Sequence, residues 1–245
     1  MRRFFIDKGV VSDSRAVISG ELYHHIARVL RMQAGDRLIL VDEDGWEHQG
    51  LIKEIGRDTL IVGVEGSILR ATGEQTRITL CQGLPKGDKL ELIIQKCTEL
   101  GLDRLIPFTS GRTVPKLDQE REFRRLERWR RIAQEASQQA NRTTVPEVTS
   151  IKAFEQMLDT VDAQVRLLLW EGERTRHLKG VVAELPNPRQ VAVIVGPEGG
   201  LSRQEAELAE QKGFVPVTLG DRILRTETAG IAITAILQYQ WGDVG

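Results

Sequence analysis

The stretch VAVIVGPEGGLSRQE (residues 191–205) decides the fold class of the second half of the chain. Its first five residues are apolar and mostly β-branched, a run typical of a buried strand. Three glycines follow within five residues. Ser202 and Glu205 then form an S-x-x-E capping box, which marks the start of a helix. The stretch therefore predicts a strand, a tight glycine-rich loop and a helix.

The same alternation of strand and helix extends on both sides of this stretch. Strands are expected at 78–81, 105–108, 165–170 and 215–219, and helices at 88–100, 119–140, 174–183, 202–212 and 226–240. This order predicts an α/β domain with a parallel sheet covered by helices on both faces. Ligands of such sheets bind beyond the carboxyl ends of the strands. Three strand ends are therefore candidates for a site: 168–171, 195–200 and 219–225.

Residues 1 to about 70 have a different pattern, with short strands and one helix. Asp44-Gly45 predicts a hairpin turn in which both central residues need φ > 0. Apolar residues recur at helical spacing between Glu21 and Met32, and Gly35 is expected to close that helix. We predict a small β-barrel-like domain over residues 1–72, followed by the α/β domain over 73–245.

Charge is balanced over the whole chain but clustered locally. The 245 residues carry 34 Lys and Arg against 35 Asp and Glu, a net charge of −1. A polyanion is therefore bound only where basic residues gather. Residues 1–31 hold six basic and three acidic residues, and residues 112–131 hold eight and four. For the second cluster we favour a solvated helix face with i,i+4 ion pairs over an RNA contact.

Other features exclude several classes of protein. Arg2-Arg3 is not followed by the apolar region of an export signal, and no run of 18 apolar residues occurs, so a cytoplasmic protein without a membrane span is expected. Cys81 and Cys97 lie in apolar segments and are interpreted as core. The histidines show no metal-binding spacing, so no metal is expected.

The glycine-rich loop has two interpretations of about equal weight. It is either a turn that needs glycine for its φ angles, or a loop on which a ligand approaches the backbone. Nucleotide-binding loops of the G-x-x-x-x-G-K-[ST] and G-x-G-x-x-G types and the G-x-S-x-G nucleophile elbow are absent.

The last strand end also has two interpretations. Ile223 and Leu224 either form a slot for a flat apolar ring or belong to the core, with the charged residues near them in surface ion pairs.

These motifs together resemble the signature of the SPOUT methyltransferases, and within them the RsmE family of 16S rRNA uracil-N3 methyltransferases. The matching residues at the strand ends are Gly196-Pro197-Glu198-Gly199-Gly200, Leu219-Gly220 and 223–229. Further matches lie at Arg2-Arg3-Phe4-Phe5, 25–31, Lys96, 99–101, Arg128-Trp129, Gln139, Arg142 and Pro146.

The resemblance implies a PUA-like RNA-binding domain, a C-terminal domain with a trefoil knot, and a homodimer. The cofactor would be S-adenosyl-L-methionine, and the target one uridine in the decoding region of 16S rRNA, methylated in the assembled small ribosomal subunit. The implied cofactor contacts are Leu169, Gly196, Pro197, Gly199, Gly200, Leu219, Gly220, Ile223 and Leu224. The implied RNA contacts are Arg2, Arg3, His25, Arg28, Arg31 and Arg142.

The catalytic residues are predicted from the chemistry of the reaction. Uracil N3 must lose a proton, and negative charge then develops on the ring oxygens, where a cation stabilises it. Arg225 is our candidate for that cation. Glu198 or Glu227 either accepts the proton or holds Arg225 in place. Two alternatives stay open, a non-catalytic RNA-binding assembly factor and a knotted methyltransferase that modifies tRNA or another rRNA nucleotide.

The final predicted helix supports a dimer independently of the resemblance. Between residues 226 and 240 apolar side chains occupy most of its circumference. A helix that is apolar all round must be covered on more than one side. We expect the sheet to cover one side and a second subunit the other.

Overall fold

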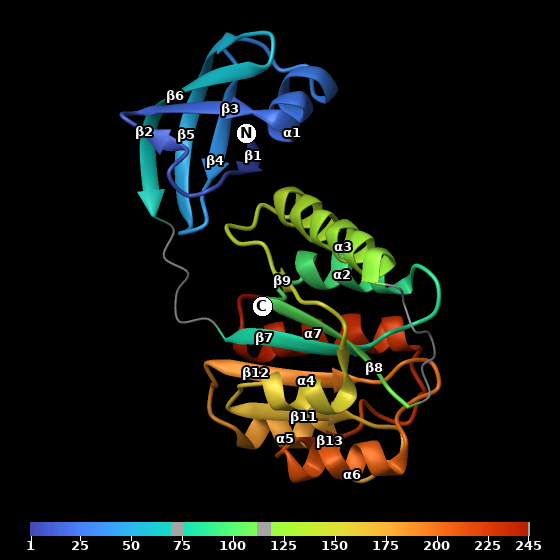
Figure 1. Cartoon of the computed structure of the whole chain (residues 1–245). Helices are drawn as coiled ribbons and strands as arrows, with labels where there is room; N and C mark the ends of the chain where they lie inside the picture. The colour runs from blue at the N-terminus through green and yellow to red at the C-terminus, as the bar shows by residue number, and fades with distance from the viewer. Residues whose placement is uncertain (70–75, 112–118, 245) are drawn as a thin grey trace. The chain divides into compact units, whose positions relative to one another are not determined.

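The computed structural model (Figure 1) describes residues 1–69, 76–111 and 119–244, with only the backbone of Gln119. The chain divides into two compact units. One comprises Met1–Gly73 with Ser137–Thr144, and the other Glu74–Ala136 with Val145–Gly245. The predicted boundary between residues 72 and 73 lies outside the described residues.

The first unit is built on a six-stranded sheet in the order β1-β4-β5-β6-β3-β2. Its strands are β1 (Arg2–Phe5), β2 (Val11–Ser12), β3 (Arg15–Ser19), β4 (Arg37–Val41), β5 (Trp46–Ile55) and β6 (Thr59–Leu69). β1 pairs in parallel with β4, and the other neighbours are antiparallel. Phe4, Ile26 and Leu40 are among the side chains of its buried core. The predicted small β domain is confirmed.

The hairpin between β4 and β5 forms as predicted, but its turn is of another type. Four residues connect the strands, and of these only Gly45 has a positive φ, of 82°. The carboxylate of Asp42 accepts hydrogen bonds from the amides of Asp44 and Trp46, both at 3.0 Å. This side chain stabilises a wider loop, so the two-residue turn that we predicted is wrong.

The predicted helix over 21–32 is shorter and partly π-helical. Helix α1 (Gly20–Tyr23) continues directly into the π-helix η1 (His24–Val29). The helical stretch ends at Leu30 because Arg31 adopts a left-handed conformation with φ of 52°. Gly35 does not close it; its amide instead donates to the carbonyl of Ile52 on β5.

The second unit is built on a parallel sheet in the order β10-β8-β7-β12-β11-β13, with β9 paired to β8. Its strands are β7 (Arg77–Gly83), β8 (Arg104–Thr109), β9 (Glu147–Val148), β10 (Lys152–Ala153), β11 (Val165–Leu169), β12 (Gln190–Val195) and β13 (Val215–Val217). All of its pairings are parallel, as predicted.

Helices cover both faces of this sheet (Figure 1). They are α2 (Lys89–Glu99), α3 (Gln119–Gln139), α4 (Phe154–Thr160), α5 (Leu178–Glu184), α6 (Arg203–Gln211) and α7 (Thr226–Trp241). One core cluster contains buried side chains of α2, α3, α5 and α7, and a second contains those of α4 and α6.

Two helices of this unit differ from the prediction. Helix α4 was not predicted from the sequence. Helix α5 begins later than predicted, because the carboxylate of Glu173 accepts hydrogen bonds from the amides of Thr175 and Arg176 and holds a turn there.

The C-terminal helix returns across the sheet. β13 lies at the sheet edge beside β11, yet α7, which follows it, packs against β7, β12 and α2. This return is what a knotted arrangement requires, and the knot itself stays a prediction. Within the described ranges, each helix is too short or too polar to span a membrane.

Candidate active site

The three strand ends identified from the sequence meet at one edge of the sheet. Leu169 at the end of β11 pairs in register with Val195 of β12 and with Val217 of β13. The segments that follow these strands therefore leave the sheet side by side. In parallel sheets this carboxyl edge is where ligands bind.

The glycine-rich loop after β12 is tightly packed against the loop after β11. Gly200 has φ of 66°, and a Cβ built there would lie 2.5 Å from Oε1 of Glu171. A Cβ on Gly196 would lie 3.3 Å from the backbone of Gly200. The turn alone thus explains Gly200. Gly220, after β13, has φ of 115° with open space around it, so a ligand can reach its backbone.

The predicted capping box at the start of α6 is confirmed. The amide of Glu205 donates to Ser202 Oγ at 3.2 Å, and the amide of Ser202 donates to Glu205 Oε2 at 2.8 Å. Glu205 Oε1 also accepts a hydrogen bond from the amide of Gly111, at 2.9 Å. This carboxylate therefore joins the loop after β8 to the start of α6.

A buried pair of polar side chains fixes the first residue of the glycine-rich loop. Gln82 Nε2, at the end of β7, donates to Thr226 Oγ1 at 2.8 Å. Thr226 Oγ1, in the first turn of α7, donates to the carbonyl of Gly196 at 2.6 Å. Both side chains are buried, so the chain of hydrogen bonds is shielded from water. No sequence pattern indicated Gln82, and Thr226 was included only within the matching segment 223–229, without a role of its own.

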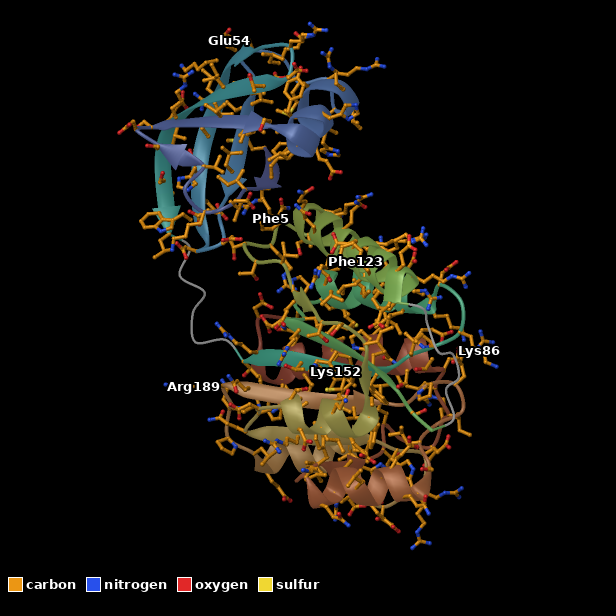
Figure 2. The ribbon with its side chains drawn as sticks, in the orientation of Figure 1. Phe5, Glu54, Lys86, Phe123, Lys152 and Arg189 are labelled. Atoms are coloured by element: carbon orange, nitrogen blue, oxygen red, sulfur yellow. The ribbon has the colours of Figure 1, made fainter. Side chains whose placement is uncertain are left out.

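Lys89, at the start of α2, binds both of the predicted catalytic carboxylates. Its Nζ lies 2.9 Å from Glu198 Oε1 and 3.4 Å from Glu227 Oε2. The amide of Lys86 donates to both oxygens of Glu198, at 3.1 and 3.2 Å. Figure 2 shows the Lys86 side chain itself extending outward. No sequence pattern indicated Lys89, which joins the glycine-rich loop to the first turn of α7.

These contacts shift two pKa values. Partial burial opposes ionisation of Glu198, but the hydrogen bonds from Lys89 and the backbone amides outweigh it and lower the pKa of Glu198. The hydrogen bond to Glu198 raises the pKa of Lys89. Glu198 is therefore a weak proton acceptor near neutral pH.

Arg225 lies at the same edge but forms no ion pair with either carboxylate among the described residues. It is the N-cap residue of α7, and its carbonyl accepts from the amide of Ala229 at 2.8 Å. Its side chain is exposed. The interpretation that Glu198 or Glu227 holds Arg225 is therefore wrong, because Lys89 occupies both carboxylates.

The apolar residues near Gly220 are not core, contrary to one of the two interpretations. The side chain of Ile223 is 90% exposed, and Leu224 is half-buried. Leu169 and Leu219 are also half-buried, and both pack against the core below the edge. An apolar surface is thus available beside the open backbone of Gly220. The slot for a flat ring stays a prediction.

In the first unit, Arg3 is not a free cation. It forms an ion pair with Glu47 in which both side chains are only 9% exposed. Arg3 is therefore committed to Glu47, because separating a buried pair leaves one charge uncompensated, and the structure does not support the RNA contact that we predicted for it. Its neighbour Arg2 is exposed and lines a hollow of about 420 Å³ together with Arg31 and Arg37.

The remaining predicted RNA contacts are partly engaged within the protein. The guanidinium of Arg28 lies 5.9 Å from the centre of the Tyr23 ring. The ring of His25 packs edge-on against Phe4, at 6.2 Å between centroids. Arg142 is half-buried and donates to Thr144 Oγ1 at 3.4 Å. All three stay predicted contacts.

Comparisons with known proteins cover both units. Residues 72–238 match the family model described as RNA methyltransferase domain, and residues 18–65 match the one described as RNA methyltransferase PUA domain. The ribosomal RNA small subunit methyltransferase E of Bacillus subtilis is 37% identical over 98% of this chain and 97% of its own length. The protein of that name from Synechocystis is 36% identical over 84% of this chain and 67% of its own length.

A solved structure gives the same match in three dimensions. It is the ribosomal RNA small subunit methyltransferase E of Neisseria gonorrhoeae, bound to S-adenosyl methionine. It has a TM-score of 0.86 and 30% sequence identity, and the match covers 98% of both chains.

Proposed function

This chain belongs to the ribosomal RNA small subunit methyltransferase E family, S-adenosylmethionine-dependent enzymes that methylate 16S rRNA, and we propose that its target is N3 of one uridine in the decoding region. The observation that supports this proposal is that three strand ends meet at one edge of a parallel sheet, where the backbone of Gly220 is open to a ligand. We propose that the assembled small ribosomal subunit in the cytoplasm is the substrate.

The residues at this edge fit S-adenosylmethionine. We propose that Leu169, Leu219 and Leu224 contact its adenine ring and that Gly220 allows the close approach of backbone to ligand. The loop containing Gly196, Pro197, Gly199 and Gly200 would line the other side, and Ile223 would cover the ligand. When bound, the cofactor supplies a methyl group on a sulfonium ion.

Within the proposed reaction, Arg225 stabilises the ring oxygens of the uracil. The N3 proton must leave as the methyl group is transferred, and negative charge then spreads onto the neighbouring carbonyl oxygens. The exposed guanidinium of Arg225 has no internal partner among the described residues, so it is available to donate to them. Such a contact lowers the pKa of N3 and favours its ionised form.

We propose Glu227 rather than Glu198 as the proton acceptor. Glu198 is held by Lys89 and by the amide of Lys86, and its pKa is lowered. Glu227 has the longer contact with Lys89: its Oε2 lies 3.4 Å from Nζ, as an ion pair without a hydrogen bond within the described part of the chain. Glu227 is therefore the less committed of the two carboxylates.

We also propose a homodimer formed through α7. The helix covers the core with Ile233 and Leu237, as expected from its composition. Its outer side leaves Ile236 and Tyr239 exposed, at 38% and 71%. Apolar and aromatic groups exposed together on one helix face are suited to a subunit contact.

The test is to map the methyl group. Small ribosomal subunits from a strain without this enzyme would be incubated with the protein and isotope-labelled S-adenosylmethionine, and the digested 16S rRNA analysed by mass spectrometry. We expect one labelled 3-methyluridine in the decoding region, with Arg225→Ala as the low-activity control. Label on another nucleotide, or no label in the 16S rRNA, would overturn the proposed target. Absence of cofactor binding by calorimetry would favour the non-catalytic alternative.

A further inference from the structure

Helix α3 carries a row of arginines along one flank. Each of the five arginines lies three or four positions from another one, so all five lie on the same side of the helix. They are Arg121, Arg124, Arg125, Arg128 and Arg131. The core-facing side of the helix is formed by Trp129, Ala133 and Ala136, which are buried. We call these five residues the arginine flank.

Three members of the arginine flank have no ion-pair partner in the described part of the chain. Arg124 pairs with Glu120 at 3.5 Å, and Arg128 pairs with Glu91 of α2 at 2.7 Å. Arg121, Arg125 and Arg131 are exposed, and among the described residues none of them forms an ion pair or a side-chain hydrogen bond.

The predicted i,i+4 pairing therefore explains only part of the flank. On another side of the helix, Arg130 pairs with Glu127 at 3.1 Å. A solvated face whose charges balance locally would be expected to provide partners of this kind throughout. On this helix the excess of positive charge instead lies on the flank, although the protein as a whole has a net charge of −1.

The length and chemistry of the flank suit a nucleic-acid backbone. From Arg121 to Arg131 the helix rises about 15 Å, which spans several consecutive phosphates. The planar guanidinium of arginine binds phosphate oxygens through two parallel hydrogen bonds. A regular series of like charges on a rigid helix matches the regular series of charges on such a backbone.

We propose that the arginine flank binds the phosphate backbone of the rRNA substrate, as an RNA contact within the catalytic unit itself. The inference rests on the proposed function for its RNA ligand. Phosphate contacts fix the register of a bound nucleic acid without reading its sequence. The flank would therefore hold the RNA in place, independently of the arginines of the first unit.

The test compares two triple variants that lose the same charge. The first is Arg121→Gln, Arg125→Gln and Arg131→Gln. The matched control is Arg130→Gln, Lys179→Gln and Lys212→Gln, three exposed cations outside the flank. Binding to small ribosomal subunits would be measured from 50 to 200 mM KCl, with cofactor affinity and thermal unfolding as checks of the fold.

For the flank variant we expect at least tenfold weaker binding at low salt and a log–log salt slope smaller by about two units, because about 0.7–0.9 counterions are released per phosphate bound. The control should keep the wild-type slope, and cofactor affinity should be unchanged in both. Equal weakening of both variants, or no weakening of the flank variant, would overturn the inference. A wild-type protein that does not bind the subunit would instead contradict the proposed function.

Discussion

At the carboxyl edge of the parallel sheet, Lys89 binds two carboxylates, whereas on the arginine flank Arg121, Arg125 and Arg131 bind none among the described residues. Glu205 at the same edge is likewise committed, to Ser202 and Gly111. A charge that is paired inside the protein fixes the loop that carries it. A charge left exposed on a rigid element is available to an external ion. The two regions thus separate a site that must be rigid from a surface that must attract a polyanion.

The largest effect is expected where the edge is most crowded. Gly200→Val should abolish cofactor binding in calorimetry, because Gly200 has φ of 66° and a side chain there would collide with Glu171. Gly213→Val is the matched control, since Gly213 also has a positive φ, of 83°, but has open space around it. Both variants carry similar backbone strain. Equal loss of affinity in the two would show that strain, rather than the cofactor loop, is responsible.

Arg225 differs from the paired charges at the carboxyl edge, because it is exposed there without an ion pair among the described residues. We expect Arg225→Ala to lose about 10²–10³-fold in single-turnover methylation at saturating cofactor, with cofactor affinity retained. Arg225→Lys should recover only part of the rate. Raising the pH should partly rescue the alanine variant, because solvent then helps to ionise N3. A variant that fails only through lost cofactor affinity would move Arg225 into the cofactor pocket.

The adjacent residues Arg2 and Arg3 show the same difference between an exposed charge and a charge paired inside the protein. Arg3→Gln should lower the free energy of unfolding by about 3 kcal/mol, because it leaves the charge of Glu47 buried without its partner. Arg2→Gln should leave stability unchanged and instead weaken RNA binding with a smaller salt slope. Denaturant unfolding and salt-dependent binding would be measured for both. Arg3→Gln with wild-type stability would contradict the assignment of a structural ion pair.

The smallest effect is expected for Lys89→Met, and it should depend on pH. The pKa of Glu198 is lowered in the folded state, so its stabilising contribution is present above the unfolded pKa and is lost as pH falls through the folded one. The pKa of Lys89 is raised, so its contribution is lost as pH rises through the folded pKa. Solvent screens these exposed groups, so wild type should exceed the variant in Tm only slightly near neutral pH.

The difference in Tm should close at both extremes of pH. Lys179→Met removes an exposed lysine that has no ion pair among the described residues, and it should show no such gap. A constant difference between wild type and Lys89→Met across the pH range would point to lost packing rather than to lost ion pairs.

The features that could be predicted from the sequence are local ones. The capping box of Ser202 and Glu205 involves residues three apart, and the strand–helix alternation gave the parallel sheet and the three strand ends. Lys89 was missed because its partner Glu198 lies 109 residues away in the chain. No spacing pattern links such residues, since only the order of strands in the sheet brings them together.

Two incorrect predictions, the hairpin turn and the start of α5, had a different cause. In each, a side-chain carboxylate accepts backbone hydrogen bonds and so determines the local conformation. The carboxylate of Asp42 organises the hairpin loop, and that of Glu173 replaces the first turn of the predicted helix. Short polar side chains in loops accept backbone hydrogen bonds in several geometries, so residue type alone does not select one. The exposure of Ile223 was equally unpredictable, since its apolarity fits a core position as well as a ligand cover.

The hydrogen bonds from Gln82 through Thr226 to Gly196 have a thermodynamic consequence. Thr226 belongs to α7, the helix of the proposed dimer, and Gly196 belongs to the proposed cofactor loop. If α7 takes part in both subunit association and cofactor binding, these two equilibria are linked. The cofactor and the second subunit then each change the protein's affinity for the other by the same factor. Dilution that separates subunits should then weaken cofactor binding, and added cofactor should lower the subunit dissociation constant by an equal ratio.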